Sequence, residues 1–311
     1  MPVKPFRFGV VNSNASSLSD WQAKVRKVEQ LGYSSLLMTD HMDDSLAPLV
    51  ALATAAQISS NLQLGTLVLS NDFRPPHLLA KEAATLDLLS EGRFELGLGA
   101  GWLEDDYQKL EIRYDSPGKR IARLDESVQL IKKLFAEPMA EFKGESYSPL
   151  PCKLSPQCLQ KPHPRILIGG GAKKILSLAG READIVGVNF PLNSKQVNNA
   201  ISTYGTLEYT RQRIRWVEEA AGERFKDIEL NTVAYLAKVV ENRKAHVNIW
   251  SRKWGQSEKD LLENPHVLIG DINQIADTLE ERREKYGFSY YVFTPESFEE
   301  MAPVVELLTG K

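Results

Sequence analysis

Residues 90–106 read Ser-Glu-Gly-Arg-Phe-Glu-Leu-Gly-Leu-Gly-Ala-Gly-Trp-Leu-Glu-Asp-Asp, and the rest of the chain can be organised around this stretch. Its first three residues predict a turn after a helix, and residues 93–98 predict a short buried strand. Glycines at positions 97, 99 and 101 then let the backbone approach a neighbour closely. Trp102 and an acidic cluster follow at once, which is typical of a barrel strand that ends at a ligand.

The spacing of these glycines has more than one interpretation. A dinucleotide-binding G-x-G-x-x-G motif needs its last glycine at position 104, where the chain has Glu104, so a Rossmann domain is not supported. The glycines either admit a ligand or relieve crowding inside a closed sheet, and their spacing alone does not choose between these roles.

Strand and helix patterns alternate along the rest of the chain. Strands are predicted at residues 6–11, 34–38, 62–69, 94–98, 165–168, 184–188, 228–240, 267–269 and 288–293. Helices are predicted at residues 20–31 with Ser19 as the cap, 48–59, 77–89, 119–135, 172–180, 194–221, 272–286 and 296–308. This alternation predicts an α/β fold, a (β/α)8 TIM barrel in one domain spanning residues 1–311.

Two segments interrupt the alternation. Residues 137–164 are rich in proline and contain both cysteines, so we expect an excursion outside the barrel, formed as a hairpin over one end. Residues 241–263 are polar and predict a helical insert, in which Trp250 and Trp254 pack the helix onto the barrel or form part of a substrate wall.

Composition excludes several classes of function. The chain has 311 residues, 38 basic and 41 acidic, with a formal charge of −3, and this balance gives no reason to expect nucleic acid as a partner. No apolar run approaches a membrane span, and residues 1–8 do not form a signal peptide. Cys152 and Cys158 lack the spacing of a metal or redox motif, so we expect a cytoplasmic protein.

The strand map selects candidate site residues, because function in a (β/α)8 barrel lies at the C-terminal ends of the strands. The candidates are Asn12, Asp40, His41, residues 68–71, residues 99–105, residues 169–172, Asn189 and residues 270–271. His41 is either a proton-transfer group or a core histidine, and its position favours proton transfer. Asp40 either orients the His41 ring or caps the turn.

Residues 169–174, Gly-Gly-Gly-Ala-Lys-Lys, follow a strand and open a helix. Unpaired backbone N–H groups and the helix dipole would meet there, which predicts a phosphate site. A tight strand-to-helix turn is the alternative, and the absence of Gly-Lys-Ser/Thr argues against a P-loop. We expect no metal site, because the other histidines are scattered and Asp105 and Asp106 are more simply a solvated loop.

Several segments together resemble the bacterial-luciferase-like superfamily of flavin- and deazaflavin-dependent oxidoreductases. They are residues 31–33 leading to Thr39-Asp40-His41, residues 64–68, residues 80–87, residues 90–102, residues 169–171 and residues 179–184. Residues 270–271, 282–284 and 301–308 resemble the branch whose members use coenzyme F420, a deazaflavin.

The resemblance implies positions for the cofactor. Its ring would lie across the strand ends, over a bulge in the third strand with a non-prolyl cis peptide between Leu67 and Val68. Asp40 and His41 would border the ring, Leu67 and Val68 would back it, and Gly101 with its neighbours Trp102 and Asp105 would lie beside it. The phosphate would be held by Gly169, Gly170, Gly171 and Ala172, with Asn189 close by.

One position departs from the superfamily pattern. In its sugar-phosphate dehydrogenases a glutamate follows the last glycine of the strand-four motif as proton donor, whereas this chain has Trp102. Glu104 or Asp105 would have to replace that acid, so oxidation of glucose 6-phosphate is in doubt.

The resemblance implies a homodimeric oxidoreductase that moves a hydride between coenzyme F420 and a small organic substrate with an activated C=C or C=N bond. His41 would handle the proton. One alternative is a monooxygenase that uses flavin mononucleotide (FMN) and dioxygen. A second alternative is a non-catalytic flavin-binding barrel, against which the intact glycines and His41 argue.

Overall fold

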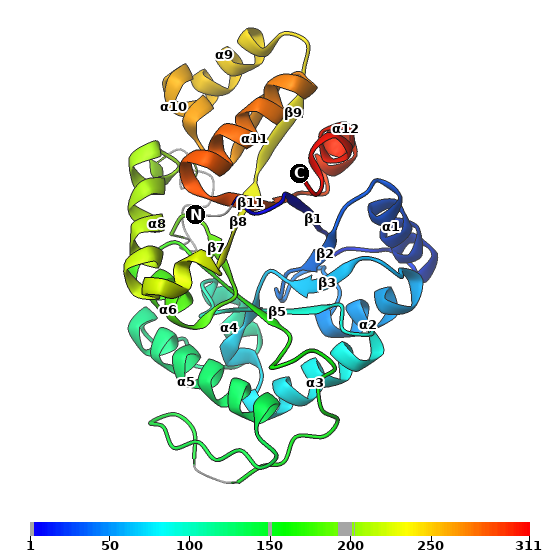
Figure 1. Ribbon diagram of the computed structural model, residues 1–311, viewed down its shortest axis with the longest axis vertical. Coiled ribbons are helices and arrows are strands. Elements are labelled where there is room, and N and C mark those ends of the chain that lie inside the picture. The colour runs from blue at the N-terminus through cyan, green and yellow to red at the C-terminus, as the bar shows by residue number, and fades with distance from the viewer. Residues whose placement is uncertain (1–2, 149–150, 192–200, 202) are drawn as a thin grey trace.

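The computed structural model describes residues 3–148, 151–191, 201 and 203–311, and its central element is a closed parallel barrel (Figure 1). The strands follow the order β3-β2-β1-β11-β8-β7-β6-β5-β4, and pairing between β3 and β5 closes the ring. Because β3 and β4 are two parts of one barrel strand, the barrel has eight strands, as the sequence predicts. The strands are β1 (Arg7–Val11), β2 (Ser35–Met38), β3 (Gln63–Thr66), β4 (Leu69–Ser70), β5 (Phe94–Gly99), β6 (Arg165–Gly170), β7 (Ile185–Val188), β8 (Glu229–Ala234) and β11 (Phe288–Phe293).

The break between β3 and β4 marks the bulge in the third strand. The peptide bond between Leu67 and Val68 is cis, as the family resemblance implies. Before the break, the Thr66 hydroxyl donates to the Gly97 carbonyl at 2.8 Å and accepts from the Gly97 amide at 2.9 Å. The bulge is therefore tied directly to β5.

Helices surround the barrel and bury their apolar faces against it. They are α1 (Leu18–Gln30), α2 (Pro48–Ile58), α3 (Pro76–Leu89), α5 (Pro117–Ala136), α6 (Lys173–Glu182), α8 (Leu207–Ala221), α11 (Ile272–Tyr286) and α12 (Phe298–Leu308). In α5, Leu124, Val128 and Ile131 are buried at helical spacing, as predicted. Ser17, not Ser19, caps α1, since its hydroxyl accepts from the Asp20 amide. Residues 192–200 and 202, within which the predicted helix 194–221 begins, lie outside the described residues.

The prediction of one long strand over residues 228–240 is wrong. β8 ends at Ala234, and β9 (Leu236–Val239) leaves the barrel to pair with β10 (Val267–Gly270) in a separate two-stranded sheet. β10 is therefore not a barrel strand, and β11 is the eighth. Residues 241–263 contain α9 (Arg243–Trp254) and α10 (Glu258–Glu263), which pack on this small sheet with Trp250 and Trp254 against its apolar cluster.

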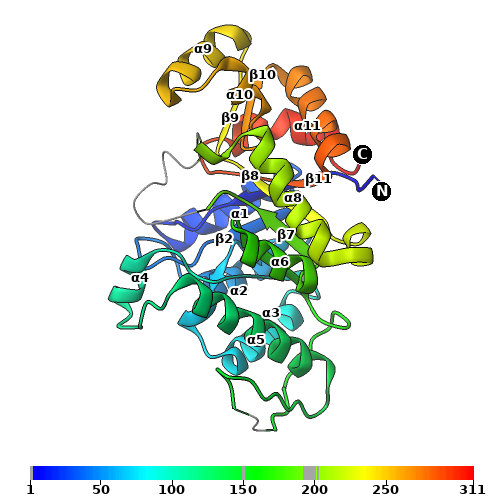
Figure 2. The same ribbon diagram turned by 90° about the vertical axis from the view of Figure 1, so that its left-hand side faces the viewer.

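The two interrupting segments lie at opposite ends of the molecule's long axis, as both ribbon views show (Figure 2). α9 and α10 lie at one end, and the loop after α5 lies at the other. Within the described part of residues 137–164, the regular pairing consists of one antiparallel bridge, between Ala140 and Cys152. The Asp87 carboxylate fixes this loop to α3 by accepting from the amides of Leu159 and Gln160 at 2.7 and 3.0 Å.

Candidate active site

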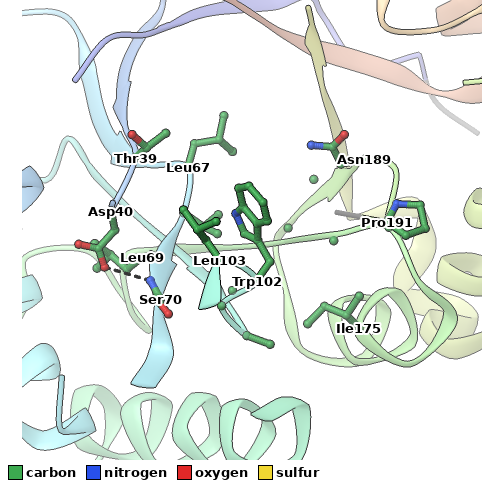
Figure 3. Close-up of a pocket in the computed structure, with 18 of the residues that line it drawn as sticks. Thr39, Asp40, Leu67, Leu69, Ser70, Trp102, Leu103, Ile175, Asn189 and Pro191 are labelled. Carbon is green, nitrogen blue, oxygen red and sulfur yellow. Dashed lines mark hydrogen bonds between the residues drawn. The ribbon is translucent and has the colours of Figure 1, made fainter. Parts of the chain in front are cut away.

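A cavity of about 550 Å³ opens at the C-terminal ends of the barrel strands (Figure 3). Its wall is mainly apolar, with contributions from Phe73, Leu103, Ile121, Ile175, Phe190 and Pro191. Of the residues to which the family resemblance assigns a position, all except Asp105 line it: Asp40, His41, Leu67, Val68, Gly101, Trp102, Gly169, Gly170, Gly171, Ala172 and Asn189. The strand-end rule therefore brings these residues to one place.

Gly101 shapes the loop that follows β5. Its φ of 72° lies in the left-handed region, which favours glycine. A Cβ at this position would overlap the Tyr107 hydroxyl and lie 2.7 Å from the Ser70 hydroxyl. Glycine is thus required here both for the backbone conformation and for close packing.

His41 follows the end of β2, and one of its ring nitrogens is hydrogen-bonded to a carboxylate. Its Nδ1 is 2.7 Å from Oδ2 of Asp106, whose other oxygen accepts from the Met42 amide at 2.9 Å. Because the carboxylate holds the proton on Nδ1, Nε2 is the nitrogen available to exchange a proton with a ligand. In the described part of the chain, no residue forms a hydrogen bond with Nε2.

Asp40 does not orient the His41 ring. Its carboxylate forms a two-pronged ion pair with Arg74, at 2.7 and 3.0 Å, and accepts from the Ser70 amide at 3.0 Å. Asp40 thereby links the end of β2 to the segment after the bulge, and it does not cap its own turn. Asp106 takes the orienting role that the sequence analysis considered for Asp40.

The acidic cluster after Trp102 forms a short helix, α4 (Glu104–Lys109), rather than a solvated loop. Asp106 is 3% exposed and faces His41, whereas Asp105 faces outward and pairs with Lys109 at 2.7 Å. Neither Glu104 nor Asp105 lines the cavity, so neither replaces the acid that is missing at position 102. The structure gives no support for contact between Asp105 and a cofactor.

Trp102 extends into the cavity between Leu103 and Ile175 in Figure 3. Its ring meets the His41 ring edge to face, with centroids 5.7 Å apart. The Tyr114 hydroxyl donates to the Trp102 carbonyl at 2.9 Å and helps to fix the loop. An aromatic face beside the proton-transfer candidate suits a planar ligand.

The predicted phosphate site is formed by the end of β6 and the start of α6. Gly169 and Gly170 belong to β6 rather than following it, and Ala172 is the N-cap of α6 without a capping side-chain bond. None of the four amides from Gly171 to Lys174 donates to another group within the described residues. These free N–H groups and the helix dipole fit an anion.

Asn189 lies across the cavity and is fixed by Tyr235. Its Nδ2 donates to the Tyr235 hydroxyl at 2.7 Å, and its Oδ1 accepts from the Phe190 amide at 2.8 Å. Burial raises the pKa of Tyr235, so the phenol stays protonated. With Asn189 donating to this oxygen, the Tyr235 O–H proton is left to donate elsewhere.

The sequence did not predict several of the lining residues, among them Asp106, Arg120 and Tyr235. Arg120 is 4% exposed and donates to the carbonyls of Ala100, Gly101 and Asp115. Its position in the first turn of a helix that follows a strand end was the available signal.

The predicted candidates Asn12, Asn71, Gly270 and Asp271 do not line the cavity. Asp271 caps α11 through a capping box with Gln274, because the strand before it, β10, is outside the barrel. Asn12 is buried and accepts from the Asn14 amide. Among the described residues, no group of three or more potential metal ligands occurs, and none of the described helices is long and apolar enough to cross a membrane.

Comparison of the sequence with known proteins gives one family. The sequence model described as luciferase-like monooxygenase matches residues 3–290. An F420-dependent glucose-6-phosphate dehydrogenase from Amycolatopsis mediterranei (strain U-32) is 31% identical over 166 residues, 51% of this chain and 49% of that protein. The pyrimidine monooxygenase RutA from Variovorax paradoxus (strain S110) is 23% identical over 282 residues, 84% of this chain and 75% of that protein. The chain spans about half the length of the dehydrogenase and of a second RutA, from Acinetobacter baylyi.

Solved structures share the fold over nearly the whole chain. The F420-dependent tetrahydromethanopterin reductase from Methanopyrus kandleri has a TM-score of 0.75 at 18% identity, with 97% of each chain covered. The monooxygenase RslO1 from Streptomyces bottropensis has a TM-score of 0.72 at 21% identity, with the same coverage. At these identities the likeness establishes the fold alone.

Proposed function

The chain belongs to the luciferase-like monooxygenase family, and from this premise we propose that it transfers a hydride between coenzyme F420 and a small organic substrate. Its relatives include an F420-dependent dehydrogenase as well as pyrimidine monooxygenases, so the family supplies the oxidoreductase class. The choice of F420 and of hydride transfer is ours.

The observation that carries the proposal is that the His41–Asp106 pair and the free amides at the start of α6 face one cavity. The amides fit the phosphate of a cofactor. The apolar side chains of Leu67 and Val68, the glycine at 101 and the aromatic face of Trp102 line the cavity and fit a flat ring across the strand ends.

In this proposal the chain provides binding, orientation and one proton. When bound, the deazaflavin supplies the hydride. The amides of Gly171 and Ala172 hold its phosphate, Leu67 and Val68 support one side of the ring, and Asp40 stays paired with Arg74 at the edge. His41 donates a proton from Nε2 to the substrate, while Asp106 holds Nδ1.

The chemistry of the cavity favours reduction of an activated C=C or C=N bond. The carboxylates lining the cavity, among the described residues, are Asp40 and Asp106, and both are already paired. His41 is therefore the group best placed to complete the addition of hydride with a proton. Trp102 in place of an acid argues against oxidation of a sugar phosphate.

A monooxygenase that uses FMN and dioxygen is the second candidate. The observation that favours it is the RutA likeness, which extends over 84% of the chain. The same amides would hold the FMN phosphate, so the cavity serves either cofactor. A flavin-binding barrel without catalysis is a third candidate. It predicts that the wild-type protein has no turnover and that replacement of His41 leaves the affinity for the flavin unchanged.

We also propose that residues 1–311 form one domain of a cytoplasmic homodimer. The support is the family resemblance together with the alternation of strands and helices along the chain. Light scattering of the purified protein at several concentrations would measure the oligomeric state, and a monomer at all of them would contradict the dimer.

Anaerobic turnover tests the function directly. The purified protein is mixed with reduced F420 and a panel of enones and cyclic imines, and loss of reduced cofactor is followed by absorbance. We expect consumption that depends on both enzyme and substrate without dioxygen. Turnover only with reduced FMN and dioxygen would instead identify the monooxygenase.

A further inference from the structure

Arg213 lies on α8, directly behind the start of α6. The side chain is 2% exposed, and its Nε donates to the Gly171 carbonyl at 3.2 Å. Its Nη1 donates to the Tyr204 carbonyl at 2.8 Å. Within the described residues, no carboxylate lies at ion-pair distance from this guanidinium.

The bond to Gly171 fixes the direction of the next amide. In a planar trans peptide the carbonyl of one residue and the N–H of the following residue point in opposite directions. Because Arg213 holds the Gly171 carbonyl, the Ala172 N–H is directed away from Arg213. The neighbouring carbonyl of Gly170 is held in the same way, by the Asn189 amide at 2.9 Å.

Packing on the other side prevents this segment from shifting. Gly171 is buried, and a Cβ there would overlap the backbone of Phe190. The peptide between Gly171 and Ala172 is thus confined between the end of β7 and the guanidinium on α8. Helix α6 then begins regularly, with the Leu176 amide donating to the Ala172 carbonyl at 3.1 Å.

From these contacts we infer that Arg213 is a positioning residue, which aims the amides of Ala172 and its neighbours at the anionic group of the cofactor. This inference rests on the proposed function, and it adds a residue that does not itself line the cavity. The anion is bound by backbone groups. Because Arg213 fixes those groups before the ligand binds, less conformational entropy is lost on binding.

The charge of Arg213 acts in the same direction. Burial lowers the pKa of Arg213 to about 10, which leaves the side chain charged at neutral pH. A buried cation without a carboxylate partner leaves positive potential behind the amides, and a bound phosphate would offset it.

The test compares ligands that differ in their phosphate. The affinities of FMN and riboflavin, and of F420 and its dephosphorylated deazariboflavin core, are measured by fluorescence titration. The variants are Arg213→Lys and Arg213→Met. We expect each Arg213 variant to reduce the preference for the phosphorylated ligand about tenfold, while affinity for the phosphate-free ligand stays within about threefold.

Arg282 provides the matched control. It is also buried, at 4% exposure, and among the described residues it donates to the carbonyls of Leu262, Pro265 and Val267. Arg282→Lys and Arg282→Met are expected to lower stability while leaving the phosphate preference unchanged. General damage to the fold would therefore lower the affinity for both ligands of a pair.

Two further outcomes separate this inference from the proposed function. If the wild-type protein prefers the phosphorylated ligand and Arg213→Lys keeps that preference in full, the role of Arg213 is overturned alone. If the wild-type protein binds the two members of each pair equally, both the phosphate site and the role of Arg213 are overturned.

Discussion

The two ends of the barrel use buried charges in opposite ways. At the N-terminal ends of the strands, arginines and glutamates pair with one another and close the barrel. At the C-terminal ends, ion pairs lie around a cavity, and buried arginines face carbonyl groups instead of carboxylates. The difference indicates that the charges at the N-terminal end stabilise the barrel, whereas those at the C-terminal end are arranged around a ligand site.

The N-terminal end is a balanced network. Arg7 binds Glu95 through Nη1 at 2.8 Å and Glu229 through Nε at 3.0 Å, and Arg165 binds Glu229 at 2.9 Å. The Arg7 guanidinium lies 4.0 Å from the centre of the Tyr290 ring. Burial disfavours the charge on Arg7, but the adjacent glutamates more than offset this and raise its pKa. Two arginines and two glutamates leave no net charge for a ligand to balance.

At the C-terminal end, positive and negative charges are paired at some positions and not at others. Asp40 with Arg74, and Asp72 with Arg123 at 2.7 Å, form closed pairs. Among the described residues, Arg120 and Arg213 donate to carbonyl and hydroxyl groups and lie over tyrosine rings, but neither pairs with a carboxylate. The free amides of α6 add to this positive potential. An anionic cofactor is the natural counter-charge.

The largest expected effect is on the network at the N-terminal end. Glu95→Ala leaves Arg7 buried beside an incomplete network, which should lower the free energy of unfolding by about 3–5 kcal/mol. Urea unfolding followed by circular dichroism measures this loss, and cofactor affinity of the folded variant should be unchanged.

The control for Glu95 is the more exposed pair of Asp125 and Arg181, whose atoms are 2.9 Å apart. Asp125→Asn should cost less than about 1 kcal/mol because water screens such pairs. A loss for Glu95→Ala as small as that for the control would show that the network does not stabilise the barrel.

At the C-terminal end, the largest effect should be on turnover. His41→Ala removes the proton donor and is expected to lower kcat about a hundredfold, while cofactor affinity changes little. His246→Gln, a replacement in α9 outside the cavity, should leave kcat unchanged. Steady-state kinetics under anaerobic conditions would measure both, and full activity of His41→Ala would remove His41 from the mechanism.

Acid should destabilise the region behind the cavity through His266. This ring is 1% exposed, its Nδ1 faces the Val233 carbonyl, and it contacts the rings of Phe190 and Tyr235. Burial lowers the pKa of His266 to about 3, and the charges of Arg213 and Arg282 act in the same direction.

Because its folded pKa lies below its unfolded value, His266 contributes stability that is complete above about pH 6.5 and is lost as the pH falls toward 3. The expected loss between pH 7 and pH 5 is about 2 kcal/mol from this residue. Urea unfolding at both pH values should show a smaller difference for His266→Phe than for the wild-type protein. Equal pH dependence in the two proteins would contradict the prediction.

The smallest expected effect is a change in cofactor affinity, caused by a substitution at the phosphate site that leaves the fold intact. Ala172→Asp supplies the missing cap of α6, which should raise the midpoint of thermal unfolding, yet it places a negative charge where the phosphate would lie. We expect the affinity for the phosphorylated cofactor to fall at least about tenfold. Ala172→Asn has a similar shape without the charge and should lose less. Unchanged affinity in Ala172→Asp would place the anion elsewhere.

The barrel could be predicted because parallel strands buried on both faces appear as continuous apolar runs between helices. The same property hid the division of residues 228–240 into β8 and β9. Residues 233–237 form an apolar run across the division, and only the pairing of β9 with β10 shows that the chain leaves the barrel at Tyr235.

The network at the N-terminal end was missed for a related reason. Arg7, Glu95 and Glu229 are charged residues within otherwise apolar strands, and that contrast was the available signal. Their partners come from strands that are distant in sequence, so the pairing depends on closure of the barrel.

Just under half of the residues that line the cavity were predicted, from their positions at strand ends. Asp106 could not be predicted, because its approach to His41 depends on α4 folding back across the cavity. The adjacent Asp105 has the same chemistry and faces outward, so residue type alone could not distinguish the two.

One titration tests directly whether the cofactor is F420. Wild-type protein and Trp102→Phe are titrated with F420 and with FMN while tryptophan fluorescence is followed. We expect F420 to bind more tightly than FMN and to quench the wild-type fluorescence, and we expect most of this quenching to be lost in Trp102→Phe. Tighter binding of FMN would contradict the choice of cofactor, and binding of neither would contradict the proposed function.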